Sequence, residues 1–132
     1  SQVGPSFGNN FNNRSEEAIG SSTDFWVAYR EGALGSHQPW LGYLLLIEEA
    51  QASMTPVRLA KAVFEPMRVF PGTSYIQRYA ILCRRLVLER NYNAAALLAS
   101  PRGKAGSYFE PESALGFLPF AKSLFGHLVG AA

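Results

Sequence analysis

The residues best suited to contact a nucleic acid form a polar run near the start of the chain. The run contains four amides and one guanidinium: Asn9, Asn10, Asn12, Asn13 and Arg14. Amide side chains and arginine are the groups that read adenine and guanine edges and hold phosphates. Asparagine also favours turns and helix caps, so the residue types alone give a weak signal. The run is nevertheless the most suggestive binding feature of the sequence.

A second pattern, Gly4-Pro5-Ser6-Phe7-Gly8, matches the G-x-S-x-G nucleophile elbow of serine hydrolases. The elbow needs a strand directly before the serine and a helix directly after it. Here Asn9–Asn13 stand between the serine and the predicted helix, and only Glu110 and His127 follow in the order that a triad needs. A glycine-rich turn is therefore the favoured interpretation, and a hydrolase that uses Ser6 is the weakest alternative.

Other candidate chemistry is sparse. His37, Cys83 and His127 have no recognisable metal-ligand spacing, and Cys83 falls at an apolar helix position that suits a small core residue. Glu48 and Glu49 end a predicted strand, where active-site carboxylates often lie in α/β sheets, although a solvated strand end is the simpler interpretation. No phosphate loop and no dinucleotide fingerprint are present in the sequence.

Composition gives few restrictions on function. The 132 residues correspond to one domain or part of one, and the net charge of +2 gives no argument for electrostatic steering. Nine of the twelve basic residues are arginine, which prefers planar, bidentate partners such as phosphates and guanine edges, but also forms ordinary surface ion pairs. The single cysteine excludes an internal disulfide, and no signal peptide is visible.

The hydrophobic periodicity predicts alternating helices and strands that would position these residues. The predicted elements are a helix from about Arg14 to Glu31, a strand at 40–48, a helix at 75–90 capped by Thr73 or Ser74, a strand at 94–100 and a helix at 119–129. Residues 1–13 and 101–111 are predicted loops, and the region 57–70 is ambiguous because prolines divide it. This alternation is typical of an α/β fold with a mainly parallel sheet.

The order of these elements predicts one further strand. A crossover helix that leads into a buried parallel strand must itself follow another strand. We expect that strand to end just before Ser1, and we therefore expect Phe25, Trp26 and Tyr29 to be partly exposed. The strand at 40–48 is apolar throughout, so helices are expected on both of its faces. The last helix is apolar nearly all round, so it is expected to be covered.

Several long segments of the sequence resemble one protein family. They are SQVGPSFGNNFNNRSEEAIGS, DFWVAYREGA, QPWLGYLLLIEEA followed by SMTPVR, and GTSYIQRYAILCRRLVLERNYNAAALLASPR. In this order they are similar to the XhoI-type type II restriction endonucleases, which cut the palindrome CTCGAG. The resemblance runs from Ser1 to about Arg102, and more loosely through Gly126-His127-Leu128.

The resemblance implies a truncated restriction-endonuclease-like α/β/α core, with residues 1–132 as a single partial domain from the C-terminal part of the fold. It implies a bacterial cytoplasmic enzyme without a membrane segment, which acts on double-stranded DNA as a homodimer. The catalytic Asp and E-x-K residues that would hold Mg²⁺ have no counterpart in this chain and are expected in an N-terminal half before Ser1. Asn9, Asn10, Asn12, Asn13 and Arg14 are then expected to face DNA. The alternative is a non-catalytic DNA-binding or interaction domain that keeps this part of the fold.

Overall fold

The computed structural model describes residues 2–3, 7–49, 74–101, 103 and 106–131, and the ambiguous region 57–70 lies outside them. The elements are β1 (Gln2–Val3), α1 (Phe7–Arg30), β2 (Gly42–Glu49), α3 (Tyr75–Leu88), β3 (Ala94–Pro101), the short 3-10 helix η2 (Ser113–Leu115) and α4 (Phe117–Ala131). The predicted alternation of helices with parallel strands is confirmed. Among the described helices, none is both long and apolar enough to cross a membrane.

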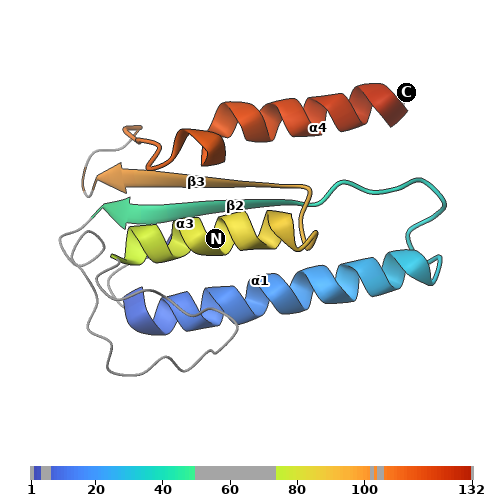
Figure 1. Cartoon of the computed structure of the whole chain (residues 1–132), viewed down its shortest axis with the longest axis horizontal. Coiled ribbons are helices and arrows are strands. Elements are labelled where there is room, and N and C mark those ends of the chain that lie inside the picture. Colours follow the sequence, from blue (N-terminus) through green and yellow to red (C-terminus); the bar gives the residue numbers. More distant parts are fainter. Residues whose placement is uncertain (1, 4–6, 50–73, 102, 104–105, 132) are drawn as a thin grey trace.

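The strands form a parallel sheet in the order β1-β2-β3. In a parallel sheet, crossover connections are usually right-handed. When successive crossovers lead in the same direction across the sheet, their helices lie on the same face. Accordingly, α1 and α3 lie on one face of the sheet and α4 lies on the other (Figure 1). The predicted extra strand exists as β1, with Gln2 opposite Leu46 of β2. The expectation that this strand ends before Ser1 is wrong, because Gln2 and Val3 belong to it.

Helix α1 begins at Phe7, earlier than the predicted start near Arg14. Its inner side is a stripe of Phe11, Ser15, Ala18 and Ser22, all buried at three- and four-residue steps. The Ser15 hydroxyl donates to the Phe11 carbonyl oxygen at 2.7 Å, so its burial leaves that hydroxyl bonded. Packing of this stripe explains the early start, because tertiary contacts override the weak helix propensity of the asparagine run.

Helix α3 begins at the predicted cap. Ser74 and Gln77 form a capping box, in which the Gln77 backbone N–H donates to the Ser74 hydroxyl and the Ser74 backbone N–H donates to the Gln77 side chain. Tyr79, Leu82 and other apolar side chains of this helix are buried. These side chains pack with β2 and β3 in one hydrophobic core.

Strand β2 buries only one of its faces. Tyr43, Leu45 and Ile47 are buried toward α1 and α3, whereas Leu44 is 43% exposed. In register, Leu45 lies opposite Leu97 of β3. The expectation that helices cover both faces of this strand is therefore wrong at Leu44, since α4 contacts the sheet mainly through β3.

Helix α4 rests on the sheet through an aromatic contact near the start of β2. The rings of Trp40 and Phe120 lie 5.2 Å apart, and the Trp40 indole N–H donates to the Ser123 hydroxyl at 3.0 Å. A Cβ at Gly42 would lie 2.3 Å from the Trp40 ring, so only glycine fits beneath this contact. No residue of α4 is buried by the described part of the chain, and the expected complete cover is absent there. On α1, Phe25, Trp26 and Tyr29 are half-buried, as predicted.

Candidate nucleic-acid interface

The polar run from Asn9 to Arg14 lies inside α1, whose first two turns carry it. The prediction of a loop at Asn9–Asn13 is therefore wrong. In Figure 1 this end of α1 lies at the same end of the molecule as the arrowheads of β2 and β3, which mark the carboxyl end of the sheet. Ligands of α/β sheets bind outside this end. The run thus lies at the end of the molecule that the binding hypothesis needs.

The helix turns the side chains of the run in different directions. Successive helical residues are separated by about 100° around the axis, so neighbours do not face one ligand together. Asn13 is exposed, Asn12 is half-buried, and Phe11 beside them is buried at 4% exposure. The side chains of Asn9 and Asn10 lie outside the described part of the structure. Of the asparagines in this run whose side chains are described, Asn13 is the more exposed and so the more accessible to a ligand from solution.

Arg14 is partly enclosed and forms an ion pair within α1. Its Nη2 lies 3.1 Å from a carboxylate oxygen of Glu17, and its side chain is 30% exposed. Its Nε is buried without a hydrogen-bond partner among the described residues. Burial and the nearby Tyr43 hydroxyl raise the pKa of the Tyr79 hydroxyl, and the Arg14 guanidinium acts in the opposite direction. Arg14 therefore lies near the contact between α1 and α3, and a phosphate could bind it only through its remaining N–H groups or by displacing Glu17.

Within the described residues, the carboxyl end of the sheet offers no metal site. Glu48 is half-buried and lies opposite Ser100 of β3, whose hydroxyl donates to the Ser107 carbonyl oxygen at 2.9 Å. The side chain of Glu49 lies outside the described residues. Within the described part of the chain, no three His, Cys, Asp or Glu side chains are close enough together to hold a metal ion.

The cysteine and the histidines are consistent with structural or surface roles. Cys83 is fully buried in α3, and burial raises the pKa of its thiol to about 12. A thiol with that pKa stays protonated at neutral pH and is a poor nucleophile and metal ligand. His37 is exposed in the segment between α1 and β2, and His127 is half-buried on α4. The predicted core role of Cys83 is confirmed.

The described residues do not form the catalytic triad that a serine hydrolase needs. Ser6 lies outside the described residues. A carboxylate oxygen of Glu110 accepts the backbone N–H of Phe117 at 2.7 Å, at the first residue of α4. His127 is ten residues further along this helix, which corresponds to about 15 Å of axial rise. Glu110 is therefore occupied at the start of α4, too far from His127 to orient it.

A sequence model of the family described as "Restriction endonuclease XhoI" matches residues 1–110. This chain belongs to the XhoI restriction endonuclease family. The match covers the whole parallel sheet together with α1 and α3. The resemblance seen in the sequence, and the α/β fold that it implied, are confirmed.

Two named relatives align with different lengths of this chain. It is 47% identical over 135 aligned positions to the type II restriction enzyme BstVI of Geobacillus stearothermophilus, with 100% of this chain and 60% of that protein covered. It is 50% identical over 90 positions to the type II restriction enzyme XhoI of Xanthomonas vasicola, with 67% of this chain and 36% of that protein covered. The chain thus spans less than two thirds of either relative. No solved structure matches it significantly.

The XhoI-family fold also brings together polar residues that sequence patterns do not connect. Arg30 and Gln38 lie near the end of α1, Arg90 and Asn93 lie between α3 and β3, and all four line one pocket. The end of α1 and the connection from α3 to β3, which carry these residues, lie at the end of the molecule away from the strand arrowheads (Figure 1). One signal in the sequence could have indicated the pocket, because Arg90 directly follows a helix where glycine or asparagine is usual.

Proposed function

We propose that this protein is part of a type II restriction endonuclease that cleaves double-stranded DNA at CTCGAG with Mg²⁺. The observation that carries the proposal is the family match over residues 1–110, together with 47% identity to BstVI along the whole chain. Both named relatives are described as type II restriction enzymes. Linearisation of a plasmid with one CTCGAG site, compared with a plasmid that carries a permuted site, tests this function.

The Mg²⁺ site belongs, in this proposal, to residues other than those described here. The described residues offer no group of three suitable ligands, so they do not by themselves fit a metal ion. The sequence contains one aspartate, Asp24, which is exposed in the middle of α1, and no E-x-K motif. The catalytic carboxylates and lysine are therefore assigned to the N-terminal half of the enzyme, and this chain supplies the sheet and helices that pack against it.

The DNA-contacting role is assigned to the start of α1. Asn9, Asn10, Asn12, Asn13 and Arg14 lie at the carboxyl end of the sheet, which favours their approach to the reacting phosphate. Because α1 turns Asn13 and Arg14 in different directions, these two residues act as separate contacts: an exposed amide at Asn13, and the remaining N–H groups of Arg14 on an adjacent side.

Replacement of Arg14 by alanine in the complete enzyme is expected to weaken DNA binding equally for cognate and permuted duplexes. A phosphate contact releases about one counterion, so the slope of log affinity against log salt concentration should fall by about one unit. The control is Arg85→Ala, which removes an arginine that pairs with Glu89 on α3. An Arg14→Ala slope equal to that of the wild-type enzyme assigns Arg14 a structural role.

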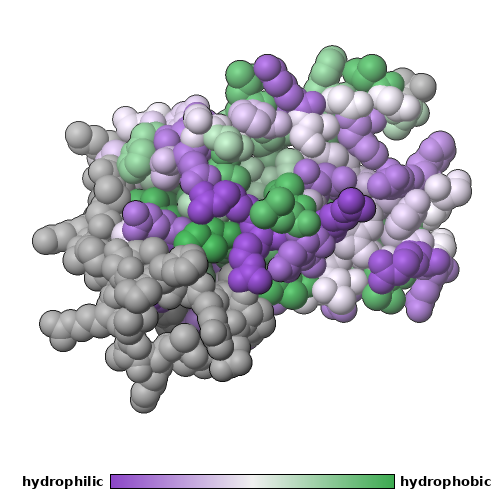
Figure 2. Space-filling model, in the orientation of Figure 1, coloured by the Kyte–Doolittle hydropathy of each residue, from purple (hydrophilic) through white to green (hydrophobic). Residues whose placement is uncertain are grey.

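The same proposal includes a homodimer, because a palindromic site mirrors a two-fold axis in the protein. Helix α4 offers a surface that could form the interface of such a dimer. Its exposed apolar side chains fall on one stripe at helical spacing: Phe117, Leu118, Phe125, Leu128 and Val129. Figure 2 shows hydrophobic side chains along the top of the molecule, over α4. A second copy of the same stripe, packed across a two-fold axis, would cover it.

Leu128→Glu in the complete enzyme is expected to weaken the dimer about 100-fold or more. Each Leu128 loses about 1.5–3 kcal/mol of apolar burial, and a two-fold interface contains two copies. Sedimentation at several protein concentrations measures this change. The control is Ser21→Glu, which adds the same charge to an exposed position of α1. One subunit of wild-type enzyme per cognate duplex would contradict the dimer itself.

A further inference from the structure

A pocket of about 480 Å³ lies between the last turns of α1, the end of α3 and the connection from α3 to β3. Its volume is in the range of ordinary small-ligand sites. Three aromatic residues, Trp26, Tyr29 and Tyr92, line it together with Val87. Its polar lining consists of two arginines and two amides, Arg30, Arg90, Gln38 and Asn93. The lining thus combines aromatic faces with cationic and amide donors.

Hydrogen bonds fix the aromatic wall of this pocket. The Trp26 indole N–H donates to the Asn91 carbonyl oxygen at 2.8 Å, and the Tyr92 hydroxyl donates to the Ala18 carbonyl oxygen at 2.8 Å. The rings of Trp26 and Tyr29 lie 6.1 Å apart, edge to face. A wall held in this way contacts a planar ligand without first losing side-chain freedom.

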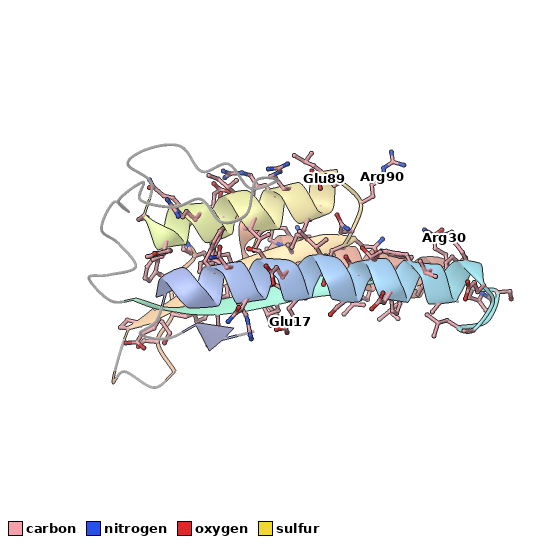
Figure 3. The ribbon with its side chains drawn as sticks, turned by 90° about the horizontal axis from the view of Figure 1, so that it is seen from below. Glu17, Arg30, Glu89 and Arg90 are labelled. Atoms are coloured by element: carbon pink, nitrogen blue, oxygen red, sulfur yellow. The ribbon has the colours of Figure 1, made fainter. Side chains whose placement is uncertain are left out.

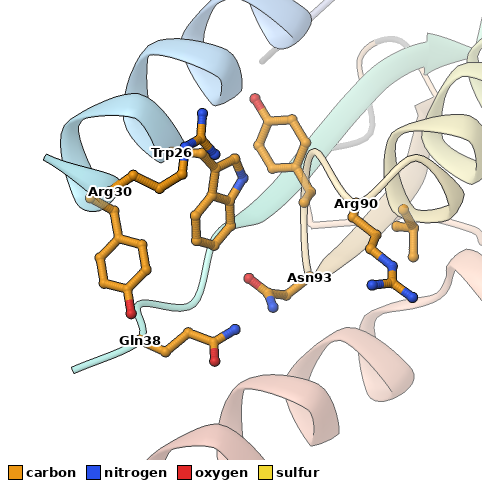
Figure 4. A pocket seen from close by; sticks show the side chains of 8 residues that line it. Trp26, Arg30, Gln38, Arg90 and Asn93 are labelled. Atoms are coloured by element: carbon orange, nitrogen blue, oxygen red, sulfur yellow. The ribbon is translucent and has the colours of Figure 1, made fainter. Parts of the chain in front are cut away.

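The polar groups of the pocket retain donors for a ligand. No ion pair engages Arg30 or Arg90 within the described part of the chain, and the neighbouring Glu89 is paired with Arg85 at 3.2 Å. The Asn93 side-chain oxygen accepts the Leu41 backbone N–H at 2.7 Å, which leaves its amide nitrogen to donate. In Figure 4, Arg30 lies beside Trp26, Gln38 lies below Trp26, and Asn93 and Arg90 lie across the pocket from them.

The backbone at Arg90 indicates that its side chain has a role. Both α1 and α3 end in the same hydrogen-bonding pattern, a Schellman motif. At the end of α1 the left-handed position is occupied by Gly32, with φ of 83°. At the end of α3 the same position is occupied by Arg90, with φ of 60°, the one non-glycine residue with positive φ in the described chain. Glycine fits this conformation better, so an arginine here is unfavourable for the fold alone.

We propose that this pocket binds a nucleotide, with the base against Trp26 and Tyr29 and with Arg30 and Arg90 as the cationic lining that attracts its phosphate. Arginine is the preferred partner of phosphate, and aromatic rings stack on bases of any sequence. The nucleotide comes either from a DNA strand, in which case the inference rests on the proposed function, or from a free mononucleotide. Figure 3 shows Arg30 and Arg90 at the same end of α1 and α3. The pocket lies away from the Asn9–Arg14 run, so it is a second, separate contact.

Titration of the protein with a nucleoside monophosphate, followed by tryptophan fluorescence, tests the proposal. We expect quenching of the Trp26 signal, and we expect it to be lost in Trp26→Phe, which keeps Trp40. The matching nucleoside and inorganic phosphate should each bind at least tenfold more weakly than the monophosphate. A short single-stranded oligonucleotide identifies the source, because a strand site binds it at least tenfold more tightly than the monophosphate, and a mononucleotide site does not.

Two charge-removing variants separate a binding role from a structural one. Arg90→Gly and Arg30→Gln should each weaken nucleotide binding about tenfold. Arg90→Gly should also leave the melting temperature unchanged or raise it, because glycine suits the left-handed position. The control Arg85→Gln removes the same charge from α3 outside the pocket and should bind like the wild type. Absence of quenching by either monophosphate or oligonucleotide, or equal binding by all three variants, overturns the proposal. In either case, intact CTCGAG cleavage by the complete enzyme would leave the proposed function standing.

Discussion

A plasmid carrying one CTCGAG site is expected to remain supercoiled when it is incubated with this protein and Mg²⁺. The reason is the missing chemistry: the sequence has no E-x-K motif, and the described residues bring no three metal-ligating side chains together. Enzymes accelerate reactions by about 10⁶-fold or more. A metal-dependent nuclease loses most of this rate acceleration when no residues bind its metal ion. Specific linearisation by a pure preparation of the 132-residue chain would overturn the assignment of the catalytic centre to other residues.

A complementation experiment tests the same assignment of the catalytic centre in a second way. BstVI is covered over 60% of its length by this chain. If the proposed function is correct, mixing the protein with the part of BstVI that the alignment leaves uncovered is expected to restore cutting at CTCGAG, because the proposal assigns the Mg²⁺-holding residues to positions outside this chain. A plasmid with a permuted site and a reaction with EDTA are the controls. DNA binding without cutting, even after complementation, would favour the alternative of a non-catalytic domain.

Leu45→Ala is expected to lower the free energy of unfolding by about 2–5 kcal/mol, which is comparable with the stability of a small domain. Leu45 is fully buried at the centre of β2, opposite Leu97 of β3, so alanine would leave a cavity in the shared core. The matched control is the adjacent residue of the same type and strand. Leu44 is 43% exposed on the opposite face, and Leu44→Ala should cost less than about 1 kcal/mol.

Urea unfolding of the two variants and the wild type, followed by circular dichroism, measures this difference. The experiment is repeated at several protein concentrations, because self-association would make the midpoint depend on concentration. Equal losses for Leu44→Ala and Leu45→Ala at low concentration would mean that both faces of β2 are covered. That result would contradict the one-sided burial of this strand.

Elements whose signals are local can be predicted from the sequence alone. Periodic apolar residues predicted α3, and the Ser74 capping position predicted its start, because both depend on contacts within a few residues. The alternation of helices with apolar runs predicted the parallel sheet and the additional strand before α1. Long matching segments identified the family, which no single motif could have done.

Features that depend on distant segments follow only from the packing of the folded chain. The run Leu44-Leu45-Leu46 has no polar alternation, so only packing against α1 and α3 determines that Leu45 faces the core. The start of α1 was misplaced because asparagine suits caps as well as helices, and the burial of Phe11 decides between them. Arg30 and Arg90 share a pocket because α1 and α3 lie on the same face of the sheet and both end on the side away from the strand arrowheads. Burial and proximity of this kind are properties of the assembled sheet and helices, and no local sequence signal records them.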